Sequence, residues 1–359
     1  MGMTPHNNLR AAQGGFSQLW TRYMKNKNTA VSTFVVSQMT KAKMKFASTT
    51  SILGLTSLLA ATMTPNLCRA CACGCGVFDV GTGLMLPENP GGMAWVEYDY
   101  QDQDQNWHWT SPAPGGNNDD KEIRTHFVTA GYQYMVDRSW GFQVEVPYDY
   151  RYFQTTGGKS GDDIVSLDWG ALGDIRVEGL YTGFFPDMSA GINFGFKLPT
   201  GDYTRNDPYD DIDRDSEIGT GSLDVLLGGF YRHALTTDNS FTWFGQTLLD
   251  LPIVSRNDYT PGTEIDAASG VYYKGWSIHQ VHITPLAQVI GSERTSDHGT
   301  EAAQPVASGY QRIMVSPGVE VDMHPVSFYA DVEVPVFLDM RGDQLVARWL
   351  LKTYVSYHF

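Results

Sequence analysis

The segment 344–359 alternates apolar and polar residues with a period of two, and this pattern constrains the fold more than any other feature of the sequence. One face carries Leu345, Ala347, Trp349, Leu351, Val355, Tyr357 and Phe359, and the other carries Gln344, Arg348, Lys352, Ser356 and His358. Successive side chains of a β-strand point to opposite sides, so this period indicates a strand and excludes a helix. The apolar face is large and ends in aromatic residues, as a strand facing lipid requires.

The same period recurs from residue 92 onward and predicts an all-β chain. The expected strands are 92–101, 122–136, 140–154, 172–185, 188–199, 220–235, 240–254, 264–276, 279–293, 308–323, 326–340 and 344–359. Short turns alternate with long polar loops, which are expected at 102–121, 155–171, 200–219, 255–263 and 294–307. This alternation predicts a transmembrane antiparallel up-and-down β-barrel of about 12 strands, with short periplasmic turns and longer external loops. A soluble β-sandwich is the alternative.

The first seventy residues differ from the rest in charge. They contain basic residues and no Asp or Glu, and Lys41, Lys43 and Lys45 precede the apolar run 52–61. A positive segment, an apolar core and small residues thereafter are typical of an export signal, so 1–70 is expected to be a signal with an N-terminal extension. A folded N-terminal helix is the alternative interpretation.

Composition excludes several classes of protein. With 42% hydrophobic and 13% aromatic residues, the chain has enough apolar side chains to fold. No apolar run is long enough for a spanning helix, and the net charge of −15 argues against nucleic acid as a partner. The terminal Phe359 resembles the signal read by the barrel-assembly machinery. Together these features predict a protein of the outer membrane, with the lipid bilayer and that machinery as partners.

Three short motifs resemble one known family. They are Gly-Asp-Ile-Arg-Val at 173–177, Phe-Lys-Leu-Pro-Thr-Gly-Asp-Tyr at 196–203 and Gly-Thr-Gly-Ser at 219–222. They look like motifs of the outer-membrane phenol-degradation meta-pathway (MetA) transporter family, over roughly 140–359. The resemblance implies a channel for small solutes, some members being linked to aromatic compounds, and it implies no enzymatic activity.

Charged residues on the polar faces of the strands are the candidate pore lining. They are Glu145, Asp149, Arg151, Asp174, Arg176, Glu178, Lys197, Glu320, Glu333, Arg348 and Lys352. Acids and bases that interleave across strands form a ladder which stabilises a barrel. The same residues would also line a hydrated pore that mildly favours cations. Both interpretations remain open.

Four cysteines crowd between 68 and 75, ahead of the barrel proper at 92–359. Cys71, Cys73 and Cys75 share one side of an extended chain, and thiolates at such spacing suit Cu(I) or Zn(II). Disulfides are the alternative. The segment 71–91 is therefore expected to be a Cys-rich periplasmic segment. Besides the channel, this leaves two alternative functions: a copper-binding outer-membrane protein, and a structural anchor for a periplasmic redox partner.

Prolines mark the strands that run toward the long loops. They are Pro147, Pro199, Pro252, Pro285 and Pro335. Proline lacks the N–H that a strand ladder needs, so it is confined to edges or bulges, and a closed barrel has no edge. The prolines therefore predict bulges at these positions, unless they merely mark the outer ends of the strands.

Overall fold

The computed structural model describes residues 86–157, 163–205, 212–302 and 307–359. All of them belong to one compact unit, which spans Asn66–Phe359. The expected export signal and the cysteine cluster lie outside the described ranges. Within those ranges, no helix is both long and apolar enough to cross a bilayer.

The described residues form a single antiparallel sheet. Its strands are β1 (Gly91–Trp109), β2 (Ser111–Pro112), β3 (Asp120–Met135), β4 (Trp140–Gly157), β5 (Asp163–Leu172), β6 (Arg176–Tyr181), β7 (Ala190–Lys197), β8 (Leu223–Ala234), β9 (Phe241–Val254), β10 (Glu264–Tyr273), β11 (Trp276–Ile278), β12 (Val281–Arg294), β13 (Tyr310–Met323) and β14 (Val326–His358). Two short 3₁₀ helices, η1 (Gly115–Asn117) and η2 (Arg214–Ser216), lie in the connections.

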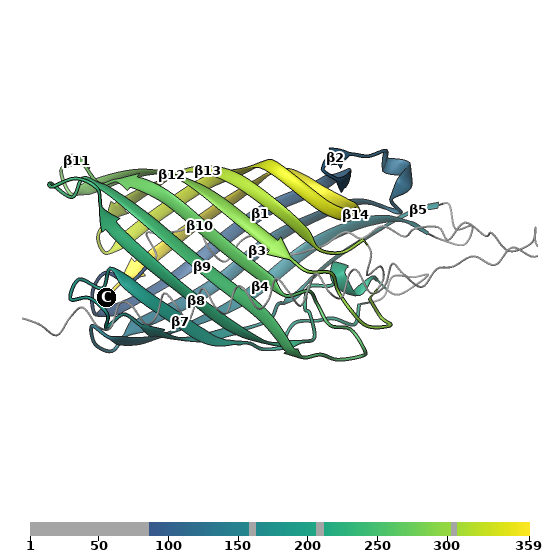
Figure 1. Cartoon of the computed structure of the whole chain (residues 1–359), viewed down its shortest axis with the longest axis horizontal. Coiled ribbons are helices and arrows are strands. Elements are labelled where there is room, and N and C mark those ends of the chain that lie inside the picture. Colours follow the sequence, from purple (N-terminus) through teal and green to yellow (C-terminus); the bar gives the residue numbers. More distant parts are fainter. Residues whose placement is uncertain (1–85, 158–162, 206–211, 303–306) are drawn as a thin grey trace, which may run out of the picture. The chain divides into compact units, whose positions relative to one another are not determined.

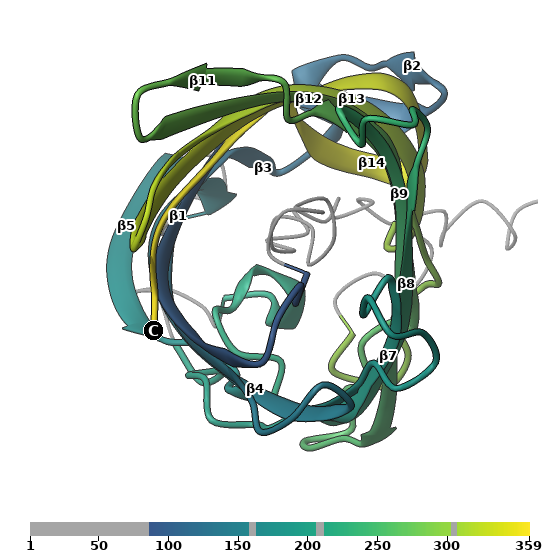
Figure 2. The same ribbon diagram turned by 90° about the vertical axis from the view of Figure 1, so that its left-hand side faces the viewer.

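The sheet closes on itself, as Figure 2 shows in a view along the barrel axis. Pairing runs from β10 through β9, β8, β7, β6, β4, β3, β1, β14, β13 and β12, and β12 pairs with β10 again. β14 passes along the wall twice, because 326–340 pairs with β13 whereas 340–358 pairs with β1. It turns at Gly342, which has a φ of 83°, and the rings of Tyr329 and Tyr354 stack across the two halves at 4.9 Å. The fold is thus the expected up-and-down β-barrel.

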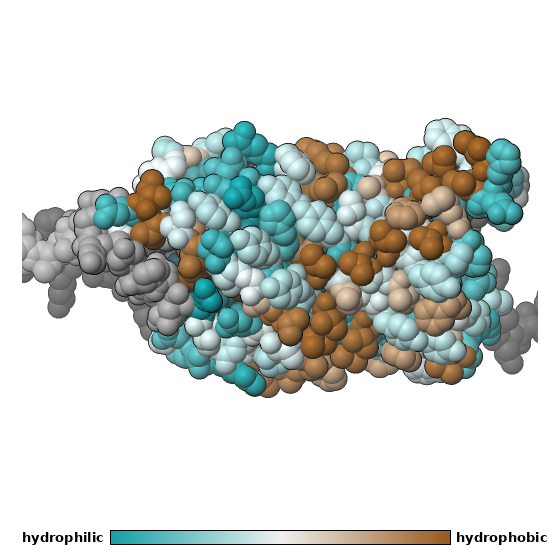
Figure 3. Space-filling model, turned by 180° about the vertical axis from the view of Figure 1, so that it is seen from behind, coloured by the Kyte–Doolittle hydropathy of each residue, from teal (hydrophilic) through white to brown (hydrophobic). Residues whose placement is uncertain are grey.

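The barrel is inside-out compared with a soluble protein. Each pass exposes apolar side chains outward, for example Val96, Phe142, Phe194, Leu227, Val289, Val315, Val334 and Val355. The inward side carries buried charged groups such as Arg151, Asp224 and Lys352. In Figure 3 apolar residues extend across the middle of one face, with hydrophilic residues gathered toward its ends. This arrangement is what a lipid-facing barrel wall requires.

Short connections gather at one end of the barrel, which we call the turn end, and long ones at the other, the loop end (Figure 1). Aromatic rings pair on the outer surface near the turn end. Trp140 and Tyr181 have centroids 4.7 Å apart, and Phe241 and Tyr273 are equally close. Aromatic girdles of this kind lie at the membrane–water boundary.

The pass formed by β5 and β6 differs from the prediction, which placed a polar loop at 155–171. β5 pairs with the loop-end half of β4 and β6 with its turn-end half. The break between them at 173–175 faces Pro147, whose carbonyl accepts a hydrogen bond from the Gly173 N–H at 2.9 Å. Because 163–171 contains several polar residues, the sequence pattern did not indicate a strand there.

Proline has different effects in different strands. Register shifts lie beside Pro252 and Pro335, and the β5–β6 break faces Pro147. Pro285 pairs with Val319 without a shift in the ladder, and Pro199 lies beyond the end of β7. The bulge interpretation therefore holds at Pro252 and Pro335 and the outer-end interpretation at Pro199, whereas Pro285 near the start of β12 fits neither.

Candidate solute site in the barrel lumen

A cavity of about 310 Å³ lies inside the barrel and is lined by residues of most of the strands. Among its lining residues are eight of the charged positions singled out in the sequence, namely Glu145, Asp149, Arg151, Asp174, Arg176, Glu178, Lys197 and Lys352. Carboxylates outnumber ammonium and guanidinium groups along the wall. This excess of negative charge favours cations over anions in the lumen.

Three further sequence candidates lie away from the cavity wall. Glu333 is fully buried on β14, and Glu320 occupies β13. Arg348 has a side chain that is 61% exposed, and its Nη2 lies 3.1 Å from an oxygen of Asp104. The ladder between β1 and β14 shifts register between Gln101 and Gln103, close to Arg348, so alternation does not fix the face there.

Lys197 forms the tightest charge cluster of the lumen. Its Nζ lies 2.6 Å from a carboxylate oxygen of Asp224 and 2.5 Å from one of Asp250. The three residues come from β7, β8 and β9. Lys197 pairs with Asp224, and Asp224 pairs with Pro252, which lies two residues after Asp250 on β9. The Asp224 side chain is fully buried, so the ammonium group is its compensation for lost hydration.

The described parts of the connection between β7 and β8, 198–205 and 212–222, fold into the loop end of the barrel, and we call them the inner loop. Arg151 on β4 donates from Nη1 to the backbone oxygens of Ser216 at 2.7 Å and Glu217 at 2.9 Å. Asp174 accepts from the Gly201 N–H at 2.9 Å and from both the N–H and hydroxyl of Thr220, at 2.8 and 2.7 Å. Two charged side chains of the wall thus hold this inner loop by charge-assisted hydrogen bonds.

Apolar packing completes the attachment of the inner loop. Ile212 and Ile218 join Phe153, Trp169 and other inward-facing wall residues in one buried cluster. The sequence predicted an external polar loop at 200–219, because its acidic composition resembles a solvated loop. Ile212 and Ile218 are only a weak indication in the sequence that this loop is buried. The backbone carbonyl groups of Ser216 and Glu217 that bind Arg151 give no indication, because every residue has one.

Two carboxyl groups of the inner loop are buried with it. Burial raises the pKa of Asp215 to about 7, and the negative charge of the nearby Asp297 also raises it. Burial likewise raises the pKa of Glu217 to about 8. Both groups therefore titrate near neutral pH, where ordinary carboxyl groups are fully ionised.

At the turn end, a short segment before β1 contacts the opposite wall. Arg232 on β8 donates to the backbone oxygens of Leu86 and Pro87, each at 3.1 Å. Glu88 lies 2.8 Å from the Nζ of Lys274 and 3.5 Å from Arg232. Leu86 and Pro87 also line the cavity, so this segment narrows the lumen from the turn end.

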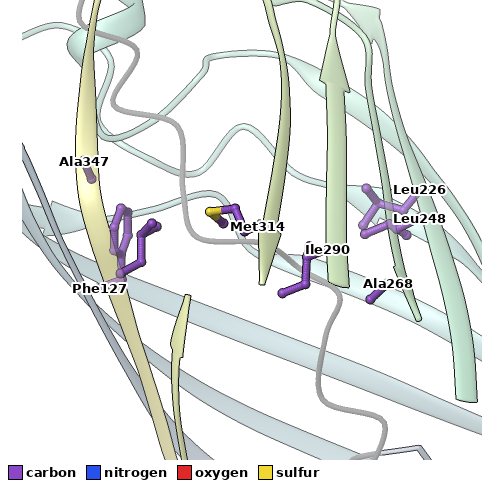
Figure 4. Close-up of a cluster of buried hydrophobic side chains, with 8 residues drawn as sticks. Phe127, Leu226, Leu248, Ala268, Ile290, Met314 and Ala347 are labelled. Atoms are coloured by element: carbon purple, nitrogen blue, oxygen red, sulfur yellow. The ribbon is translucent and has the colours of Figure 1, made fainter. Parts of the chain in front are cut away.

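An apolar collar runs around much of the inner wall. It consists of Phe127, Leu226, Leu248, Ala268, Ile290, Met314, Ala347 and Leu350, and Figure 4 shows these side chains projecting from successive strands. An aromatic cluster, which includes Phe244, Tyr272, Leu286, Tyr329 and Tyr354, lies on the β9–β14 side. The lumen therefore offers both charged and apolar surface. The collar is absent from the sequence prediction. Ala347 and Leu345, which the alternation of 344–359 placed on the lipid-facing side, are buried on the inner side of the wall.

The structure resembles solved outer-membrane proteins in fold. It matches an outer membrane channel, described as COG4313, from Pseudomonas putida F1, with a TM-score of 0.55 and 12% identity, covering 79% of this chain and 100% of that one. A Pseudomonas aeruginosa FadL homologue matches with a TM-score of 0.41 and 10% identity over 75% of this chain and 90% of that one. No family model and no curated protein matches the sequence.

The closed barrel, its apolar outer surface and the first of these likenesses define the class of protein. The chain is an outer-membrane β-barrel. Within the described ranges, no group of three or more His, Cys, Asp or Glu side chains is arranged to hold a metal ion. The copper or zinc site at Cys71, Cys73 and Cys75 lies outside those ranges and stays a prediction.

Proposed function

We propose that the protein is a channel that carries small solutes across the outer membrane, with apolar or aromatic compounds among them. The observation that carries the proposal is the cavity inside the barrel, which borders both the charged wall and apolar collar residues such as Phe127 and Leu248. A lumen filled only to hold the wall together would need no cavity of about 310 Å³. The resemblance of 173–177, 196–203 and 219–222 to the phenol-degradation transporter family supports the same class of solute.

The channel is narrowed at both ends in the described structure. The inner loop occupies the loop end, and the segment at Leu86 and Pro87 narrows the turn end. The short turns face the periplasm and the long connections face outward, as in other barrels of this class. Passage of a solute thus requires it to move past the inner loop, cross the collar and leave beside Arg232.

Single-channel recording tests this proposal. The purified barrel, shown to be folded by its heat-modifiable mobility on gels, is placed in a planar bilayer in symmetric KCl. Discrete conductance steps are expected in symmetric KCl. When a KCl gradient is then applied, the reversal potential should favour K⁺, because carboxylates outnumber cationic groups along the cavity. Proteoliposomes should also take up a small neutral aromatic compound faster than protein-free vesicles. Folded protein that gives neither current nor uptake would refute the channel.

A further inference from the structure

One carboxylate of the cavity lacks a hydrogen-bonding partner. Asp149 on β4 is 6% exposed, and its Oδ1 is buried without a hydrogen bond. Within the described ranges, no hydrogen bond or ion pair involves this side chain. Nearby charged groups are engaged elsewhere, because Arg151 holds the inner loop and Arg176 lies 3.9 Å from Glu145. A buried carboxylate of this kind is costly unless a ligand supplies a donor or a positive charge.

An aromatic ring lies directly beside this carboxylate. In the ladder between β3 and β4, Phe127 pairs with Asp149, and in the ladder between β1 and β3 it pairs with Asp99. All three side chains line the cavity. Directly opposite residues of antiparallel strands have Cβ atoms about 5 Å apart, so the ring stands between two carboxylates.

The two carboxylates differ in their surroundings. Asp99 pairs in register with Lys352, whose Nζ lies 3.8 Å from Glu97, so positive charge is already close to it. The side chain of Asp99 is 4% exposed and its Oδ1 has no hydrogen bond. On the other side, Asp149 pairs with the uncharged Ala171 of β5, and its cationic neighbours Arg151 and Arg176 are engaged with the inner loop and with Glu145. Asp149 is therefore the main anchor for a positive group, and Asp99 adds to the negative potential.

We propose that Asp149, Phe127 and Asp99 form a binding site for the ammonium group of an organic cation that crosses the channel. A carboxylate and the face of an aromatic ring are the two partners that an alkylammonium group prefers. Phe127 also belongs to the apolar collar, where it clusters with Ala347 and Leu350. The hydrocarbon part of the same solute can lie against that collar. An inorganic cation would gain nothing from the collar, so the site favours amines with an apolar body.

This inference rests on the proposed function, because it names a class of solute for the same lumen. Its test uses equilibrium binding to the folded barrel in detergent, which needs no open channel. Phenethylammonium chloride is titrated into the full protein in a calorimeter, with 2-phenylethanol as the neutral analogue. The wild-type barrel should bind the ammonium compound about tenfold or more tightly than the alcohol, which lacks the charge.

Three variants locate the site. Asp149→Asn keeps the shape of the side chain and should weaken phenethylammonium binding about tenfold or more. Phe127→Leu should weaken it about threefold to tenfold, because the cation–π contact is lost while the apolar volume is kept. Glu320→Gln is the matched control, since it removes the same charge from β13, away from the cavity wall. Its affinity should stay within about twofold of wild type, because water and salt screen the more distant charge.

The proposal is overturned if Asp149→Asn binds phenethylammonium as tightly as wild type, provided that both are folded. Equal weakening by Asp149→Asn and Glu320→Gln would also overturn it, since the lumen would then act only through its total charge. Binding of the alcohol as tightly as the ammonium compound would leave an apolar site alone and refute the ammonium site. If binding follows the proposal but bilayers stay silent, the site stands and the channel fails. If current flows without ammonium binding, the channel stands and the site fails.

Discussion

Removing the charge of Lys197 should strongly destabilise the barrel. In Lys197→Met, the carboxylates of Asp224 and Asp250 lose an ammonium group that lies 2.6 and 2.5 Å away. Asp224 is fully buried and Asp250 is 13% exposed, so water compensates little. Breaking a buried ion pair on one side typically costs about 3–5 kcal/mol, and here two carboxylates also repel each other. We therefore expect the free energy of unfolding to fall by about 3–5 kcal/mol.

Reversible unfolding in guanidinium, followed by tryptophan fluorescence in lipid vesicles, measures this change. The control is Arg348→Met, which removes an equally charged group from an exposed pair with Asp104 and should cost about 0–1 kcal/mol. A triple variant that also carries Asp224→Asn and Asp250→Asn has no buried charge left in the cluster and should recover most of the lost stability. If Lys197→Met unfolds like wild type, or if the triple variant is no more stable than the single one, the electrostatic reasoning is refuted.

Three further changes test the inner loop, the turn end and the wall. The pKa values of Asp215 and Glu217 are raised to about 7 and 8 by burial, so their protonated forms stabilise the folded state fully below about pH 4. That stability is lost as pH rises from about 4 to about 8, where only the unfolded state has released these protons, so the thermal midpoint should fall over this range and level off above it. Asp215→Asn with Glu217→Gln should flatten the profile. Arg232→Ala removes the donor to the segment before β1 and should raise single-channel conductance; unchanged conductance would show that this contact does not narrow the path. Gly131→Val would place a Cβ 2.0 Å from the Trp95 ring, so unfolding experiments should show a loss of about 1–3 kcal/mol.

The wall of the barrel could be predicted because its physics is local. Lipid on one side and a polar lumen on the other impose the same alternation on every pass of the wall. The outward orientation of Phe142 and Val355 could therefore be predicted from the sequence alone. The short turn at 137–139 also fixes the register that sets Phe127 opposite Asp149. By contrast, β1 and β3, which pair Asp99 with Phe127, are joined by the longer connection 110–119, and no short turn fixes that register.

The inner loop could not be predicted because its anchors are backbone atoms. Arg151 contacts the carbonyl groups of Ser216 and Glu217, and carbonyl groups leave no trace in residue identity. Its acidic residues suggested contact with water, whereas the structure buries Asp215 and Glu217 beside the wall. Arg348 shows the complementary limit, since a register shift near it interrupts the alternation on which its assignment depended.

The seam between β1 and β14 has a consequence for how the barrel is made. Met93 pairs with His358, and Gly92 and Phe359 exchange two backbone hydrogen bonds at 2.9 Å. Contacts between such distant parts of a chain carry a large loop-closure entropy and form slowly. The ring therefore cannot close until its last strand has been synthesised, and every shorter nascent chain has two unpaired edges. Slow, late closure keeps the chain unfolded during export. Until the membrane is reached, the unpaired strand edges can pair with other chains, so other proteins must shield them.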